Sequence, residues 1–129
     1  MAEAGTKLTN EQKRARIRAS YDLSARGEFE RSVQEGWADD GVFHSQMRGR
    51  EFRGKPAILD EVRKQNQEVK TIWHVHDVLV SDDHGVALLE AEQEGRRRQI
   101  VHVLHVDDAG KIKETWAVYP TPLRRQRPA

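Results

Sequence analysis

The spacing of apolar residues changes near the middle of the chain. In the first 70 residues they recur every three or four positions, as in Phe29, Val33 and Trp37. This spacing predicts amphipathic helices. From Thr71 onward apolar and polar residues alternate, which is typical of strands with one buried face. The sequence therefore predicts a helical first half and a strand-rich second half.

Capping and turn residues limit the predicted helices. Thr9 and Gln12 form a capping box, and Gly27 is a natural helix end. Gly54-Lys55-Pro56 is a typical start for a later helix, because proline is favoured in the first turn. We expect helices over 10–26, over 28–37 and from Gly54 onward, with short extended segments at 42–45 and 51–53.

Four runs rich in valine, isoleucine and aromatic residues form the second half. They are TIWHVHDVLV (71–80), GVALLEAEQE (85–94), RRQIVHVLHV (97–106) and KIKETWAVY (111–119). The connections are too short for parallel crossovers, so they predict an antiparallel meander. Helices followed by a meander predict an α+β fold with the helices on one face of the sheet.

The turns predict which residues share the covered face. A two-residue turn beginning at Gly95 pairs Leu89 with His102, and a three-residue turn ending at Gly110 continues the row to Trp116. A loop over 81–85 brings Asp77 opposite Leu89. We therefore expect Asp77, Leu89, His102 and Trp116 in one row on the covered face. A one-residue shift of the last strand would instead turn Thr115, Ala117 and Tyr119 inward.

Composition limits the class of protein. The 129 residues carry a formal net charge of +1, so no overall field attracts nucleic acid or a membrane surface. The chain has no cysteine, which excludes disulfides and thiolate chemistry and fits the cytoplasm. No run is long enough for a membrane span. We expect one cytoplasmic domain over 10–120, with a flexible N-terminus at 1–9 and a basic flexible tail at 121–129.

Several segments resemble a known family. WADD before the first strand, RGKPAI at the third helix, HDVLVSDDHGVAL and VHVLHVDDAGKIKETW resemble the SnoaL-like branch of the nuclear transport factor two-like superfamily. The resemblance covers about residues 12–120. It implies a cone-shaped α+β barrel, in which a curved antiparallel sheet wrapped by three N-terminal helices surrounds an apolar pocket, commonly as a homodimer through the outer sheet face. Relatives include polyketide cyclases, ketosteroid isomerase, scytalone dehydratase, limonene epoxide hydrolase and non-catalytic binding modules.

The resemblance also implies roles for particular positions. His102 aligns with the protonated aspartic acid of the steroid isomerase, and cyclases of this kind have a catalytic histidine on the same strand. Ser45 and Ser20 stand where the isomerase has its base aspartate and its tyrosine, and Ala117 stands where cyclases have an acid aspartate. The two serines argue against steroid isomerase chemistry, and Ala117 counts against the acid step of the cyclases. Epoxide opening is disfavoured as well, because the aligned strand LLEAEQ has no arginine.

The candidate site combines these two sources. His102 and Asp77 are the candidate catalytic residues, since imidazole and a desolvated carboxyl group can both exchange protons near neutral pH. The three tryptophans are more often core or dimer contacts than surfaces for a ligand. We expect no metal and no other cofactor, because the His74-Val75-His76 pair is predicted to face outward. The candidate substrate-binding residues are Tyr21, Trp37, Phe43, His44, Trp73, Trp116 and Tyr119.

Three functions remain open. The favoured one is a cyclase, isomerase or dehydratase that acts by acid–base chemistry on a polyketide-like or other apolar carbonyl compound. The alternatives are a non-catalytic small-ligand-binding module and a dimeric interaction module of the same fold. The expected partners are an apolar small molecule and a second copy of the chain, and neither nucleic acid nor a membrane.

Overall fold

The computed structural model describes residues 7–45 and 49–119. The predicted tail at 121–129 and most of the predicted N-terminal segment at 1–9 therefore lie outside the described residues. The helices are α1 (Asn10–Ala25), α2 (Phe29–Gly36) and α3 (Lys55–Glu68), and the strands are β1 (Trp37–Ser45), β2 (Arg50–Arg53), β3 (Ile72–Ser81), β4 (His84–Gln93), β5 (Arg96–Val106) and β6 (Ile112–Val118).

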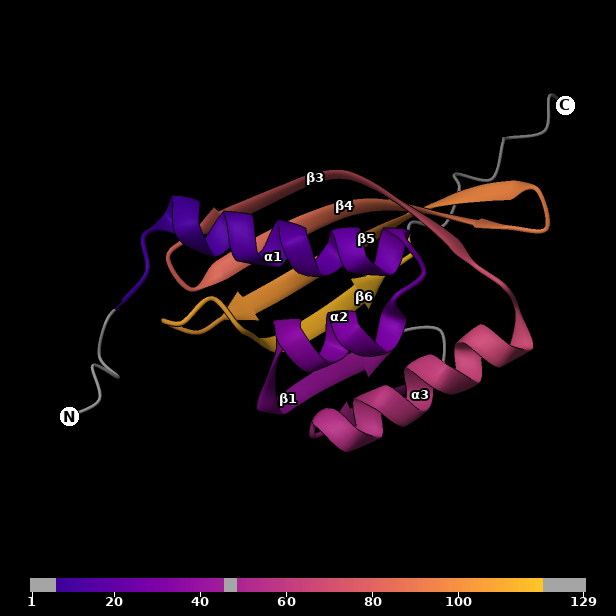
Figure 1. Cartoon of the computed structure of the whole chain (residues 1–129), viewed down its shortest axis with the longest axis horizontal. Coiled ribbons are helices and arrows are strands. Elements are labelled where there is room, and N and C mark those ends of the chain that lie inside the picture. Colours follow the sequence, from indigo (N-terminus) through magenta and orange to yellow (C-terminus); the bar gives the residue numbers. More distant parts are fainter. Residues whose placement is uncertain (1–6, 46–48, 120–129) are drawn as a thin grey trace, which may run out of the picture.

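The described helices pack against one face of a curved sheet (Figure 1). The sheet order is β2-β1-β6-β5-β4-β3. Ile17, Val33 and Ile58 from the helices are buried against Leu89 and Leu104 from the sheet. This arrangement confirms the predicted α+β class with three helices on one face. In the described ranges, no helix is both long and apolar enough to cross a bilayer.

The helix limits agree closely with the predicted ones. Thr9 Oγ1 accepts a hydrogen bond from the Gln12 amide (3.1 Å), and Gln12 Oε1 accepts one from the Thr9 amide (2.9 Å), which completes the capping box. Gly27 ends the turn after α1 with a φ of 84°, a left-handed conformation that glycine adopts without strain. Pro56 lies in the first turn of α3, as predicted.

The sheet is mixed rather than antiparallel throughout. Strands β3 to β6 form the predicted antiparallel meander. However, β1 pairs with β6 in parallel, with Phe43 opposite Thr115. Strand β1 also begins at Trp37, earlier than the predicted 42–45, and the ADDG segment lies where its pairing with β6 is irregular. The long connection through β2, α3 and the strands β3 to β5 makes a parallel neighbour possible.

The turn between β4 and β5 differs from the prediction by one position. Glu94 and Gly95 form it, with φ values of 53° and 80°, so that Gln93 pairs with Arg96. Positive φ at both positions is typical of a type I′ turn. His102 therefore lies opposite Ala87 instead of Leu89. A shift of two residues in register keeps every side chain on its predicted face, so His102 still faces the helices.

The turn between β3 and β4 changes the face of a predicted site residue. It contains only two residues, which pairs Val80 with Gly85 and turns Val78 inward. Asp77 is thereby turned to the outer face. A β-bulge between Val75 and Asp77 then restores the predicted inward side of Trp73, which pairs with Ala91.

A second irregularity, in the pairing of β5 with β6, reverses the predicted faces of the last strand. The predicted turn is present, since the Asp107 amide donates to the Lys111 carbonyl (2.9 Å) and Gly110 has a φ of 79°. Between His105 and Val106 the register shifts, so His102 pairs with Ala117. The one-residue alternative is thus correct: Thr115 and Ala117 are buried, and Trp116 points outward.

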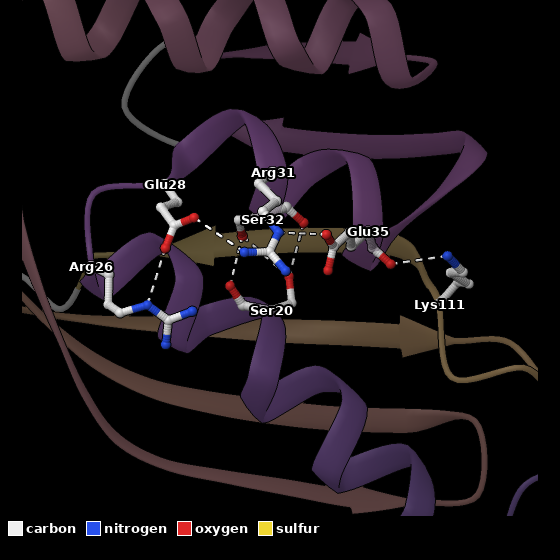
Figure 2. A network of polar contacts seen from close by, with 7 residues as sticks. All are labelled: Ser20, Arg26, Glu28, Arg31, Ser32, Glu35 and Lys111. Carbon is white, nitrogen blue, oxygen red and sulfur yellow. Dashed lines mark hydrogen bonds and ion pairs between the residues drawn. The ribbon is translucent and has the colours of Figure 1, made fainter.

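Helix α1 is fixed at both ends. Near its beginning, the buried Lys13 donates from Nζ to the carbonyl of Asp82 (2.7 Å), and Asn10 Oδ1 accepts from the Asp82 amide (2.9 Å). Near its end, a serine cluster joins it to α2 (Figure 2). Ser20 Oγ donates to the Ser32 carbonyl (3.0 Å), and Ser32 Oγ donates to the Ser20 carbonyl (2.7 Å). Tyr21 lies within this fixed helix.

The serine cluster needs a small residue on α2. A Cβ atom on Gly36 would lie 2.1 Å from Ser20 Oγ and 2.8 Å from Ser20 Cβ. Gly36→Ala is therefore expected to displace the Ser20 hydroxyl and lower the free energy of unfolding by about 1 to 3 kcal/mol. Urea unfolding measures this, with Gln34→Ala on the exposed side of α2 as the control. The cost should shrink in a Ser20→Ala background, and an equal cost in both backgrounds would contradict the steric explanation.

Candidate functional site

A cavity of about 120 Å³ lies between the helices and the inner face of the sheet. All three helices contribute to its wall, together with β1, β3, β4 and β5. Its inner part is apolar and buried, and its outer part is bordered by half-exposed and exposed residues at the end of α3. The lining residues are Tyr21, Ser24, Phe29, Ser32, Val33, Trp37, Phe43, Ile58, Val62, Gln65, Asn66, Thr71, Trp73, Leu89 and His102.

Tyr21 and His102 form a hydrogen-bonded pair in this wall. The distance from Tyr21 Oη to His102 Nδ1 is 2.7 Å, which is short for such a bond. The two residues come from α1 and β5, and are 81 positions apart in the sequence. His102 Nε2 makes no hydrogen bond to any described residue. This nitrogen is therefore available to a molecule in the cavity.

The apolar surroundings keep both members of the pair neutral. Burial lowers the pKa of His102 to about 4, because the imidazolium form loses its hydration. Burial raises the pKa of Tyr21 well above its ordinary value for the corresponding reason, since the phenolate form is disfavoured. Two neutral arrangements follow: Tyr21 donates to Nδ1, or Nδ1–H donates to Tyr21 and Nε2 carries the free lone pair.

Aromatic rings surround the pair. The His102 ring centroid lies 6.4 Å from that of Phe43 and 6.4 Å from that of Trp73. Phe43 in turn meets Trp37 edge to face, at 6.3 Å and 83°. Rings at these distances give the cavity flat, apolar walls. Tyr21, Trp37, Phe43, Trp73 and His102 are thus brought together, as predicted for the pocket.

Asp77 does not belong to this site, contrary to the prediction. It lies on the outer side of the edge strand β3, where its Oδ1 accepts from the Val78 amide (2.8 Å) and pairs with Arg14 (3.3 Å). The bond from the Val78 amide and then the Arg14 guanidinium lower the pKa of its carboxyl group. Asp77 is therefore an ionised surface residue. The prediction failed because the short turn after β3 reversed its face.

His44 and Trp116 are also outside the cavity. Both lie on the outer sheet face, where their rings stack at 5.2 Å and 7°. His44 Nε2 lies 2.6 Å from Glu114 and Nδ1 lies 3.3 Å from Glu51. Trp116 faces outward because the register shift turns β6 over, and His44 faces outward because it follows the inward Phe43 on β1. Tyr119 packs against the core cluster without lining the cavity.

Two kinds of lining residue were not predicted as site residues. Phe29, Val33, Ile58 and Val62 lie on apolar helical stripes, so periodicity indicated their inward side but could not separate a cavity wall from a filled core. Gln65, Asn66 and Thr71 carry no such signal. They reach the cavity only because α3 ends and β3 begins beside it.

The donor set does not suggest a metal centre. Within residues 7–45 and 49–119, no three histidine or carboxylate side chains converge as metal ligands. His74, from the His-Val-His segment, instead hydrogen-bonds through Nε2 to Glu92 (3.0 Å). Tyr21 and His102 are a hydrogen-bonded pair among the described residues that line the cavity.

A curved sheet covered by helices, with a histidine in an apolar pocket between the two layers, defines a class of small α+β pocket domains. The chain belongs to the SnoaL-like domain family, whose model matches residues 17–115. The resemblance noted from the sequence is thereby confirmed. Among curated proteins, no sequence matches the chain.

Solved structures agree with this family at the level of the fold. A protein of unknown function with a cystatin-like fold from Methylobium petroleophilum has a TM-score of 0.76 and 18% identity, over 92% of this chain and 82% of that one. A provisionally named polyketide cyclase from Sinorhizobium meliloti has a TM-score of 0.68 and 16% identity, over 79% of this chain and 93% of that one. A provisionally named ketosteroid isomerase from Kribbella flavida has a TM-score of 0.69 and 20% identity, over 93% of each chain. Identities this low establish the fold and not the activity.

The buried histidine predicts a pH dependence of stability. Below pH 6.5 the unfolded chain binds a proton at His102 that the folded chain, with a pKa of about 4, does not bind. Protonation therefore stabilises the unfolded state as the pH falls. At about 1.4 kcal/mol per pKa unit, the free energy of unfolding should be roughly 2 kcal/mol lower at pH 5 than at pH 7. Urea unfolding at pH 7 and pH 5 measures it. His102→Gln should lack this loss, whereas His105→Gln should keep it; an equal loss in His102→Gln would contradict the assignment.

Proposed function

We propose that the chain is a small-molecule enzyme that moves protons on an apolar carbonyl compound, in a cyclisation, isomerisation or dehydration. The observation that carries this proposal is the 2.7 Å contact between Tyr21 Oη and His102 Nδ1 in the wall of an apolar cavity. Two neutral proton-exchanging groups in contact, with one ring nitrogen still free, are a suitable arrangement for general acid–base catalysis.

The proposed step keeps the cavity uncharged. His102 starts with its proton on Nδ1, donating to Tyr21, while Nε2 is unprotonated. Nε2 takes a proton from the carbon next to the carbonyl group, and that C–H pair of electrons forms the enol double bond. Tyr21 gives its proton to the carbonyl oxygen and receives the Nδ1 proton in return. The substrate becomes an enol, and the histidine ends as its other neutral tautomer.

This exchange makes the low pKa of His102 compatible with catalysis. An imidazolium or a free phenolate would be costly in the cavity, because the same burial lowers the pKa of His102 and raises that of Tyr21. In the concerted exchange neither ion forms, since one proton enters the pair as another leaves. The apolar wall then disfavours charged alternatives and leaves the neutral route open.

A non-catalytic binding module of the same fold is the second candidate. It is favoured by the lack of a carboxylate among the described lining residues, together with an imidazole whose pKa of about 4 makes it a weak base. In that case Tyr21 and His102 would hold a ligand oxygen by hydrogen bonds alone. The two candidates differ in one measurable property, which is proton exchange with the ligand.

Exchange of α-hydrogens for deuterium tests the proposal. Cyclohexenone in D₂O should exchange faster with the wild-type protein than without it, as followed by NMR. Tyr21→Phe and His102→Gln should each lower that rate by about tenfold or more, because each interrupts the proton path. His105→Gln, on the outer side of the same strand, is the matched control and should exchange normally. If cyclohexenone binds but its α-hydrogens exchange no faster, the result would contradict the proposed enzyme and support the binding module.

We also propose that the protein forms a homodimer through the outer sheet face. Leu79, Trp116 and Val118 are exposed there, at 53%, 37% and 39%, beside half-buried valines of β4 and β5. An apolar sheet surface of this kind is commonly covered by a second subunit.

Light scattering tests the dimer. The mass should be twice the 14.9 kDa of one chain at micromolar concentration. Trp116→Glu should shift it toward the monomer by placing a charge in the contact, whereas Gln67→Glu on the exposed side of α3 should leave it unchanged. A monomeric wild-type protein would contradict the proposed interface.

A further inference from the structure

We propose that the cavity accepts a neutral molecule of about one six-membered ring, bound by a single oxygen atom at the Tyr21–His102 pair. The inference rests on the proposed function and narrows its substrate class. It separates this chain from enzymes that enclose a fused polycyclic compound. Four features of the cavity support it: its volume, its charge, the distribution of free hydrogen-bonding groups and its aromatic walls.

The volume limits the size of the ligand. At about 120 Å³, the cavity is somewhat smaller than an engineered apolar cavity of about 150 Å³ that holds benzene. Pockets for drug-sized molecules usually measure roughly 300 to 1,000 Å³. Buried residues form the inner end, including Val33, Trp37, Ile58 and Leu89, so deepening the cavity requires repacking of the core. One ring can be enclosed, and fused rings cannot.

The charge of the wall excludes an anionic or cationic ligand. No aspartate, glutamate, lysine or arginine is among the described lining residues. Charged side chains of the same helices pair with one another on the surface, as in Arg18–Asp22 on α1 and Arg63–Glu30 between α3 and α2. A carboxylate in the cavity would lose its hydration and gain no cation. A neutral ligand avoids this cost.

The polar side chains of the cavity wall leave one principal site for a hydrogen bond to a ligand. Ser24 donates to Ser32 (2.9 Å), and Ser32 is already bonded to Ser20. Near the outer end, Gln65 donates to Glu61 (2.8 Å), and Thr71 accepts from Gln93 (2.9 Å). These groups each have a protein partner, and the other lining amide, Asn66, is exposed at the end of α3. The deep tyrosine–histidine pair, by contrast, has a ring nitrogen that bonds to none of the described residues.

The aromatic walls favour an unsaturated ring. Trp37, Phe43 and Trp73 present ring surfaces to the same space as His102. A flat ring stacks on or meets such surfaces edge to face with less loss of contact than a puckered one. A cyclic enone satisfies all of these conditions, since it combines a planar conjugated segment, no charge and one carbonyl oxygen.

Three probes test the inference on the full-length wild-type protein. They are cyclohexenone, the same ring bearing a carboxylate, and progesterone as a fused four-ring enone. Calorimetry and quenching of tryptophan fluorescence should show cyclohexenone binding at least about tenfold more tightly than either of the others. His102→Gln should weaken cyclohexenone binding, while His105→Gln should not. Equal or tighter binding of the carboxylate or of progesterone, or no binding of cyclohexenone, would overturn the inference.

The outcomes separate this inference from the proposed function. If cyclohexenone binds selectively but its α-hydrogens do not exchange, the ligand class stands and the catalytic proposal fails. If progesterone is turned over and cyclohexenone is not, acid–base catalysis stands and the ligand class is wrong. The two measurements use the same protein samples, and circular dichroism establishes that each variant is folded.

Discussion

The placement of Tyr21 against His102 depends on how helix α1 is held over the sheet. Lys13 and Asn10 attach its first turns to the β3–β4 turn, and the serine cluster attaches its last turns to α2. Between these two attachments the Tyr21 phenol points inward and contacts the imidazole of His102 on β5. Because the helix layer is fixed at its edges and the sheet curves away beneath it, a space remains between them. The cavity follows from this constraint and from no single element.

The tyrosine–histidine pair that lies in this space places polar groups in apolar surroundings. A tyrosine and a histidine in an apolar wall each need a hydrogen-bond partner, and each provides the partner of the other. The bond satisfies one ring nitrogen and leaves the second without a partner among the described residues. A filled core would place an aliphatic residue at that position on β5, as Leu104 does two residues further along the same face. The unsatisfied polarity is typical of a binding or catalytic site.

Much of the fold could be predicted from the sequence, because periodicity, capping and turn residues act locally. The capping box at Thr9, the helix end at Gly27 and the turn at Gly110 behave as expected. His102 was also placed on the correct face, since an error of two residues in register is harmless. Asp77 and Trp116 were placed on the wrong face of the sheet for related physical reasons. A short turn and irregular strand pairing each reverse faces by a single residue, and neither has a clear signature in the local sequence.

The parallel pairing of β1 with β6 has a consequence for the order in which the chain acquires its structure. Phe43 is aligned with Thr115, so this edge of the sheet closes only when segments about 70 residues apart have met. Such long-range closure is slow compared with the formation of helices and hairpins. During synthesis, β1 and the three helices leave the ribosome well before their neighbour strand exists. The cavity wall that Phe43 provides is therefore among the last parts to form, and a chain that stops before residue 112 lacks the strand on which β1 docks.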